Sequence, residues 1–214
     1  MKFLVAFFVL FVACVYANRP CSAPHELTFR ASRWNYGETY YERFFGEYDR
    51  FNKRVVLFEE DFESGTKKQR ELLFLHKEGV GYDFNLQSKH CKKFKVGAFK
   101  PFEVPSGATY EGEFSIGGPT EEVTIDRWSD KISSRREHWI GEFSLKTCYP
   151  ISQFMIEEGN FNKTSFTFFY DTVKGIVNPN DFNVPKECEK SAIEVDMPIN
   201  ARLAKAMYSG TLHD

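Results

Sequence analysis

One stretch near the C-terminus, TSFTFFYDTVKGIVNPNDFNVPKEC (Thr164–Cys188), indicates the class of fold. In its first half Phe166, Phe168 and Tyr170 occupy every second position, and this period of two predicts a β-strand. Phe169 lies between them, so aromatic side chains fall on both faces of the predicted strand. We therefore expect protein or a bound ligand to cover both faces.

The second half of the same stretch has the composition of a return loop with a covalent anchor. Gly175, Pro179 and Pro185 argue against a long helix and predict a series of turns. The stretch ends at Cys188, which needs a partner elsewhere in the chain. A strand, a return loop and a disulfide anchor together predict that this segment fastens the fold.

The N-terminus has the features of a secretory signal peptide. Lys2 precedes an apolar run over residues 3–16, and Val-Tyr-Ala at 15–17 is an acceptable cleavage site. The run is shorter than the roughly 20 apolar residues that span a bilayer, which favours a signal peptide over the alternative of a membrane anchor. No later segment is apolar enough to cross a membrane. We expect residues 1–17 to be removed and 18–214 to form one secreted domain that is not an integral membrane protein.

Length and charge narrow the class of protein further. Removal of the signal peptide leaves 214 − 17 = 197 residues, which suits one domain with a sizeable core. Lys2 leaves with it, so the formal charge changes from 28 − 30 = −2 to 27 − 30 = −3. Short basic runs occur, but no basic stripe is present. We therefore expect no nucleic-acid partner.

Four cysteines remain in the mature chain, at Cys21, Cys91, Cys148 and Cys188. An even number in an oxidising compartment predicts two disulfides, and four cysteines allow three connectivities. The chain has no CxxC pair, which argues against a zinc site. Each bridge would close a loop of about a hundred residues and contribute several kcal/mol in the chain-entropy model.

The sequon Asn162-Lys163-Thr164 predicts N-glycosylation of Asn162 in a secreted protein. Gly159 and Asn160 precede it and indicate an exposed turn, where the modifying enzyme can reach the asparagine. The alternative is a sequon that stays unmodified because it is sterically hidden.

Strand patterns recur along the chain, whereas helical periodicity is scarce. The ranges 39–48 and 54–62 flank a turn and predict a hairpin, and 82–87 alternates most regularly. Further strands are expected at 71–76, 110–116, 123–128, 137–146 and 151–156. About ten strands with short polar turns predict an antiparallel sandwich, half-barrel or barrel. The single helical candidate is 200–207, in a tail (189–214) that we expect to be loosely ordered.

Catalytic motifs are missing from the sequence. It contains no GxSxG, HExxH or P-loop motif, and its five histidines are scattered without metal-ligand spacing. Clustered carboxylates such as those at 59–61 are typical of a solvated strand edge. We therefore expect no enzymatic activity and no organic cofactor.

Aromatic residues make up 17% of the chain, a large share. Two interpretations are open: they fill an ordinary core, or part of them lines a cavity for a hydrophobic molecule such as a lipid or fatty acid. For the second interpretation we predict these wall residues: Tyr82, Phe84, Phe114, Trp128, Trp139, Phe143 and Phe168.

Oxygen-bearing side chains gather in and beside the return loop. Asp171, Asn178, Asn180 and Asp181 offer carboxylate and amide ligands for Ca2+. No EF-hand order is present, and turn residues of this kind are common without a metal. A calcium site here is one expectation, and ordinary turn chemistry is the other.

Short segments spread over the mature chain carry a family resemblance. They are Cys-Ser-Ala-Pro (21–24), Tyr48-Asp49, Arg54-Val55, 72–76 with Tyr82, Cys91, 104–108, Gly112, Ile116-Gly117, Cys-Tyr-Pro (148–150), Phe-Tyr-Asp (169–171), Gly175-Ile176, Asn178-Pro179, Phe182, Pro185 and Cys188. In this order and spacing the chain resembles the ependymins and ependymin-related proteins. It departs from them at Thr147, where a glycine is common, and in having four mature cysteines where many vertebrate relatives have six.

The resemblance implies a secreted, often glycosylated, non-enzymatic protein, commonly a homodimer, that binds Ca2+ and associates with extracellular matrix; some relatives are lysosomal. It implies an all-β fold with minor α content: two stacked antiparallel sheets curve into a half-barrel around an apolar pocket, as in bacterial periplasmic lipoprotein carriers. It also implies the disulfides Cys21–Cys148 and Cys91–Cys188. We expect a glycoprotein that holds a hydrophobic ligand; the alternative is a calcium-dependent adhesive matrix glycoprotein with a filled core.

Overall fold

The computed structural model describes residues 19–36, 41–63, 66–159, 164–194 and 196–212 of the chain. The predicted signal peptide and the sequon asparagine Asn162 lie outside the described residues.

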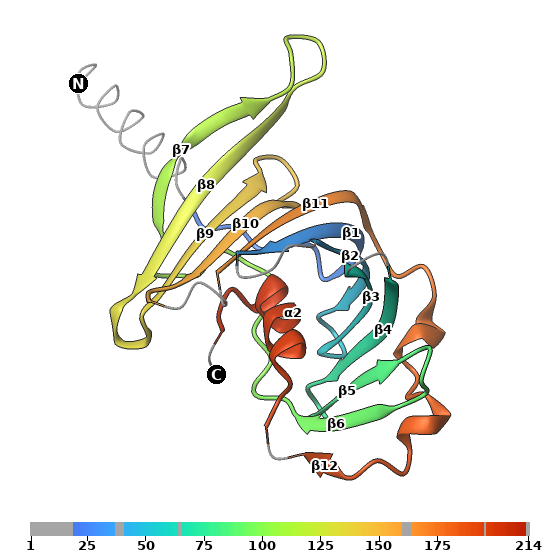
Figure 1. Ribbon diagram of the computed structural model, residues 1–214. Coiled ribbons are helices and arrows are strands. Elements are labelled where there is room, and N and C mark those ends of the chain that lie inside the picture. The colour runs from blue at the N-terminus through green and yellow to red at the C-terminus, as the bar shows by residue number, and fades with distance from the viewer. Residues whose placement is uncertain (1–18, 37–40, 64–65, 160–163, 195, 213–214) are drawn as a thin grey trace, which may run out of the picture.

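The strands form one open, strongly curved sheet (Figure 1). Its order is β12-β6-β5-β4-β3-β2-β1-β11-β10-β9-β8-β7. The strands are β1 (Glu26–Asn35), β2 (Tyr41–Asp49), β3 (Arg54–Glu63), β4 (Thr66–Leu75), β5 (Val80–Asn85), β6 (Cys91–Lys95), β7 (Thr109–Ile116), β8 (Val123–Ile132), β9 (Glu137–Ser144), β10 (Pro150–Glu157), β11 (Ser165–Lys174) and β12 (Ile193–Glu194). Neighbours are antiparallel except β12, which pairs parallel with β6. The predicted all-β class and half-barrel curvature are confirmed, with hydrogen bonds that join the strands into a single sheet.

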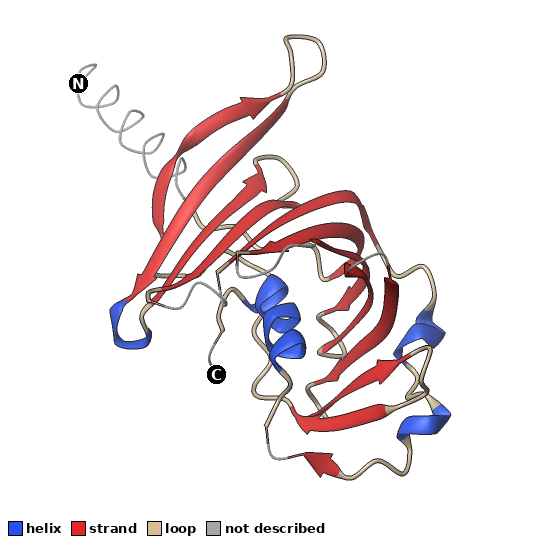
Figure 2. Ribbon diagram, in the orientation of Figure 1, coloured by secondary structure: helices blue, strands red, loops and turns tan. Residues whose placement is uncertain are grey.

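Helical segments are short and few among the described residues (Figure 2). They are the 3-10 turns η1 (Ser133–Arg135), η3 (Pro179–Phe182) and η4 (Lys186–Cys188), and the helix α2 (Ile199–Ser209). α2 lies on the concave side of the curved sheet (Figure 1). In the described part of the chain, no helix has the length and apolar character needed to span a membrane.

Alternation along the strands separates a concave from a convex face. In β1, Leu27, Phe29 and Ala31 are buried on the concave side, whereas Arg30 and Trp34 are exposed on the convex side. The residues directly opposite on neighbouring strands share these faces. The concave space between the sheet and α2 is called the trough below.

Most of the predicted elements are present, although the central strand was not predicted. The hairpin at 39–48 and 54–62 is β2 and β3, and the helix at 200–207 is α2. The strand β1, at the centre of the sheet between β2 and β11, and the short β6 were missed. The C-terminal tail is not loose, because α2 buries most of its side chains in the trough.

The strand at 165–174 was expected to be covered on both faces, and this expectation is wrong. Phe169 is buried in the trough, but Phe168 on the convex face keeps 41% of its surface exposed. Phe166 and Tyr170 share that convex face and are half-buried. The strand is central because β1 and β10 flank it, and it is covered on one face.

Two disulfides fasten the fold at long range. Cys21 bonds to Cys148 and Cys91 bonds to Cys188, across 127 and 97 residues of chain. This is the pairing that the family resemblance implies. The second bridge ties the return loop to β6, immediately before the chain turns toward α2.

Candidate functional site: the trough

α2 fills much of the trough with small and apolar side chains. The buried residues of the helix are Ala201, Leu203, Ala204, Lys205, Ala206, Met207 and Tyr208. Alanine at three of these positions lets the helix lie close to the sheet, because it adds little side-chain volume between the two backbones. Leu212, just after the helix, belongs to the same hydrophobic cluster.

The strands opposite α2 present an apolar surface at one end of the trough. In one row across the sheet, Leu27, Tyr48, Val55 and Phe74 lie side by side on β1 to β4. The rings of Tyr48 and Phe74 both contact the ring of Tyr208 in α2, at centroid distances of 6.5 and 5.7 Å. Burial of these apolar surfaces holds the helix in place.

A small number of hydrogen bonds fix the position of α2. The ring nitrogen Nε2 of His76 lies 2.9 Å from the hydroxyl of Tyr208. Gln153 donates to the carbonyl of Ala206 at 3.0 Å, and at the start of the helix Asn200 donates to Asp83 at 3.2 Å. The helix is therefore positioned at its start, middle and end.

Glu137 of β9 holds the chain after the helix. Its carboxylate accepts from the hydroxyl of Thr211 at 2.8 Å and from the backbone amide of Leu212 at 3.1 Å. All three residues are buried. These contacts anchor the C-terminal segment to the opposite wall of the trough.

The other end of the trough carries charge. Arg33 of β1 lies opposite Thr167 of β11 and Glu42 of β2, and the line continues through Asp61 of β3 to Lys68 of β4. We call these five residues the polar row. Arg33 is 0% exposed and donates from Nε to Glu42 at 2.5 Å.

The buried carboxylates at this end have shifted pKa values. Burial raises the pKa of Glu42, but the charge and hydrogen bond of Arg33, together with hydrogen bonds to Glu59 and Asn35, leave a net lowering. Burial and the nearby charge of Glu42 hold the pKa of Glu59 well above its usual value. Burial, followed by the charge of Glu42, also raises the pKa of Asp61. The trough therefore contains carboxyl groups whose pKa values are shifted in different directions at one end, and an apolar surface at the other end.

Three of the predicted wall residues lie in the cluster around α2. Trp128, Trp139 and Phe143 are buried there, and the indole of Trp139 donates to Gln153 at 3.1 Å. Phe114 lies apart from that cluster, half-buried beneath the guanidinium of Arg127 at 4.5 Å. Phe168 points away from the trough, as described above.

Tyr82 and Phe84 do not face the trough. They are buried on the convex side of β5, in a second cluster with Phe182 and Cys188 of the return loop. The regular alternation of β5 places them on one face, but the pattern carries no information on which face is concave. The return loop covers this convex surface, so burial alone does not distinguish it from a pocket wall.

The predicted calcium ligands lie at two places. Asp171 is exposed on β11, 3.9 Å from Arg30. Asn178 begins η3, where its oxygen accepts from the backbone of Asn180 and its amide donates to Asp181. The described contacts of Asp171 thus do not place it near the other predicted ligands, Asn178, Asn180 and Asp181.

Acidic groups surround Asp181 beneath the return loop. Burial raises the pKa of Glu71 to about 7, and the charges of Asp181 and Glu187 add to the shift. Burial likewise raises the pKa of Asp181. Packing of the return loop against β4 therefore brings like charges together.

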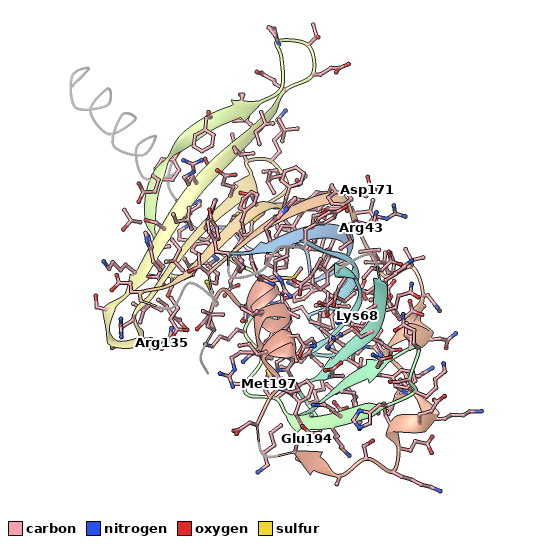
Figure 3. The ribbon with its side chains drawn as sticks, viewed as in Figure 1. Arg43, Lys68, Arg135, Asp171, Glu194 and Met197 are labelled. Carbon is pink, nitrogen blue, oxygen red and sulfur yellow. A yellow bond between two sulfur atoms is a disulfide. The ribbon has the colours of Figure 1, made fainter. Side chains whose placement is uncertain are left out.

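Aromatic side chains also gather on the convex face of the central strands. Trp34 stacks on Tyr41 and on Phe166, and Phe168 stacks on Tyr170. A groove of about 340 Å³ opens beside them, lined by two tilted rings and two arginines among others: Phe45, Phe58, Arg30 and Arg43. Figure 3 shows Arg43 and Asp171 on this outer side of the sheet.

The polar row was not predicted from the sequence. Arg33, Glu42 and Asp61 occupy the same strand phase as buried apolar residues such as Ala31, Phe44 and Leu57. A charged residue at an alternating position that apolar residues otherwise occupy is the signal that could have identified them. At 59–61 the solvated-edge interpretation is wrong for Glu59 and Asp61, which are buried because β3 is an inner strand with two paired neighbours.

With the fold and the trough described, comparison with known proteins decides the family. The sequence model described as Ependymin matches residues 64–188, more than half of the chain. The chain belongs to the ependymin family. Mammalian ependymin-related protein 1 of Mus musculus is 33% identical over 179 residues, which cover 82% of this chain and 79% of that protein. Ependymin-1 of Oncorhynchus mykiss is 24% identical over 155 residues, which cover 69% of this chain and 67% of that protein.

Solved structures agree on the fold of this ependymin-family chain. The crystal structure of an uncharacterized conserved protein from Thermus thermophilus superposes with a TM-score of 0.53, covering 82% of this chain and 91% of that one. Its sequence identity is 8%, so this likeness shows the fold alone. The two disulfides fit an extracellular protein. The family match ends at Cys188, and α2 follows it.

Proposed function

We propose that the mature chain is a secreted, non-enzymatic glycoprotein that holds a hydrophobic ligand, a lipid or fatty acid, in the trough. The observation that carries the proposal is the apolar concave surface of the curved sheet. The helix α2 covers this surface, and α2 lies in the chain after the last disulfide-bonded cysteine, Cys188. The described residues of the connection between Cys188 and α2 are mostly exposed.

In this proposal α2 occupies the space that the ligand takes. The helix contacts the sheet chiefly through apolar surfaces and the few hydrogen bonds described above. A ligand that buries equivalent apolar surface offsets the loss of those contacts, at roughly 25 cal/mol per Å² before ordering costs are subtracted. Binding therefore requires α2 to move away from part of the sheet.

The test uses the full secreted chain after lipid extraction. A fluorescent fatty acid is titrated against it, and hydrogen exchange of residues 199–209 is measured with and without ligand. We expect saturable binding and faster exchange in α2. A chain that binds no fatty acid, and that carries no lipid when it is secreted, contradicts the proposal.

A second candidate is an adhesive matrix glycoprotein whose trough is permanently filled by α2. The exposed aromatic face around Trp34 and Phe168 favours it, because large exposed apolar patches mark interaction surfaces. For the same reason we propose this convex face as the contact surface of a homodimer. Matrix binding that a chelator abolishes, together with no lipid binding, would support this candidate over the first.

A further inference from the structure

The turn that joins β8 to β9 ends in two adjacent arginines, Arg135 and Arg136. It contains the 3-10 turn η1, none of whose residues is buried, and Arg136 itself is exposed. Figure 3 shows Arg135 at the end of this hairpin. Because exposed loop tips are preferred sites of proteolytic cleavage, the peptide bond between Arg136 and Glu137 is accessible to a protease.

Three other pairs of adjacent basic residues occur in the sequence, and the structure holds each of them in place. Lys67-Lys68 lies in β4 and Lys92-Lys93 in β6, and both strands have a paired neighbour on either side. In the third pair, Lys53-Arg54, the guanidinium of Arg54 lies 4.1 Å from the ring centroid of Phe182. The pair Arg135-Arg136 differs from these because its second residue is exposed and lies outside a strand.

The backbone of Arg136 adopts the left-handed conformation, at φ 55° and ψ 31°. This conformation is unfavourable for a residue that carries a Cβ atom. Two backbone hydrogen bonds hold it: the amide of Arg136 donates to Ser133 at 3.2 Å, and its carbonyl accepts from Glu158 at 2.8 Å. Endoproteases bind their substrates in an extended form. Opening this turn therefore breaks two hydrogen bonds, relieves an unfavourable backbone conformation and costs less than opening a paired strand.

We propose that the Arg136–Glu137 bond is a processing site for a serine endoprotease that recognises paired basic residues. Such a protease holds two substrate guanidinium groups on its own carboxylates, and Arg135 and Arg136 supply both groups. Water hydrolyses the peptide bond: its oxygen adds to the carbonyl carbon of Arg136, which becomes a carboxylate, and the nitrogen of Glu137 leaves as an ammonium group. The proposal rests on the secreted location proposed above, where such proteases act, and not on the lipid ligand.

Both disulfides keep the cleaved chain in one molecule. Cys21 and Cys91 precede the cut, and their partners Cys148 and Cys188 follow it. Each bridge therefore joins the two products covalently. β9 also stays paired with β8 and β10. The expected product is a two-chain protein that keeps its sheet.

The cut lies next to the residue that anchors the segment after α2. The carboxylate of Glu137 accepts from Thr211 and Leu212, and Arg135 lies 3.4 Å from it. Cleavage gives Glu137 an ammonium group of its own, which competes with Thr211 and Leu212 for that carboxylate. We therefore expect processing to loosen the C-terminal segment and α2.

The test uses the full chain purified from secreting cells, before and after incubation with a purified endoprotease specific for paired basic residues. We expect one new N-terminus, Glu-His-Trp at 137–139, and two fragments on a reducing gel. Without reductant the product should remain a single band, because both disulfides span the cut. Hydrogen exchange of residues 199–209 should be faster in the cleaved protein than in the intact one.

Two variants of exposed turn residues separate recognition of this site from general susceptibility. Arg136→Gln removes the residue before the cut and should slow cleavage by about tenfold or more, because the protease loses a charge-assisted contact. Lys53→Gln is the matched control, since Lys53 is also exposed on a turn, at φ 54°, and belongs to a basic pair. It should be cleaved as fast as the unmodified chain.

Three results would overturn the proposal. Cleavage at another bond, or no cleavage under conditions that cut the denatured chain after Arg136, would show that the folded turn is not recognised. Fragments that separate without reductant would contradict the two-chain product. Unchanged exchange in α2 after complete cleavage would contradict the loosening of the helix. Correct cleavage of a chain that cells retain would count against the proposed secretion and would support recognition of the turn.

Discussion

The hydroxyl of Tyr208 in α2 lies 2.9 Å from Nε2 of His76, the first residue after β4, while Nδ1 of the same ring lies 2.8 Å from the carbonyl of Gly97. Because a carbonyl accepts hydrogen bonds, the neutral ring carries its proton on Nδ1, and Nε2 accepts from Tyr208. This polar contact joins the helix in the trough to the turn that follows β4.

Removing that hydroxyl should loosen α2. We expect Tyr208→Phe to lower the free energy of unfolding by about 1 kcal/mol, because Nε2 of His76 loses its donor. Urea unfolding measures the loss, and hydrogen exchange in α2 should quicken. Tyr36→Phe is the control, since Tyr36 is 61% exposed. Equal stability of Tyr208→Phe and the unmodified chain would show that the contact does not hold the helix.

Removing one partner of the buried pair Arg33–Glu42 should lower the free energy of unfolding strongly. We expect Arg33→Met to cost about 3–5 kcal/mol, because the carboxylate of Glu42 stays buried without its hydrogen-bonded cation. The double variant Arg33→Met/Glu42→Leu should recover part of that loss. Urea unfolding of the set gives the coupling energy. A double variant less stable than Arg33→Met alone would contradict this interpretation.

Glu71 should make stability depend on pH. Its folded-state pKa of about 7 lies above the ordinary value of 4.5, so the folded state binds more protons between these values. This group therefore lowers stability as the pH rises from about 4.5 to about 7, with no further change above. We expect Glu71→Gln to melt higher than the unmodified chain at pH 8 and at the same temperature at pH 4.

Glu60 provides a contrast in the same experiment. A hydrogen bond from Lys67 lowers its pKa, burial opposes this, and the side chain is 32% exposed. Glu60→Gln should therefore lower the melting temperature slightly at neutral pH, opposite in sign to Glu71→Gln. If both exchanges raised the melting temperature at pH 8, simple removal of negative charge would explain the result.

The convex aromatic face should support self-association. We expect the double variant Trp34→Ser/Phe168→Ser to shift the sedimentation equilibrium toward monomer, because two exposed rings leave the proposed contact. Val177→Ser, which removes an exposed apolar side chain from the return loop, is the matched control. Dimers that persist in the double variant would place the contact elsewhere.

The class of fold was accessible from the sequence because period-two patterns and turn residues are local signals. The strand at 82–87 and the turn between β2 and β3 could be predicted from local sequence, without knowledge of contacts between distant segments. β1 was missed although its residues alternate, because Arg33 and Asn35 interrupt the apolar phase. Both side chains are buried, and Glu42 on the next strand accepts a hydrogen bond from each of them. That pairing is tertiary, so no local pattern reveals it.

The site was accessible only in part for a related reason. Trp128, Trp139 and Phe143 reach the trough, but Tyr82 and Phe84 face the return loop. An alternating strand looks the same whether its apolar face is concave or convex. The curvature of the sheet and the position of α2 decide this, and both arise from contacts between distant segments.

The central claim is that the trough, and not the convex face, holds the hydrophobic ligand. A photoactivatable fatty acid bound to the full secreted chain, followed by peptide mapping of the labelled residues, tests it directly. We predict label on concave residues such as Phe29, Phe74 and Trp139 and on α2, and little on Phe45 or Phe168. Label concentrated on Phe45, Phe58 and Phe168, or no label above an unmodified competitor, would contradict the claim.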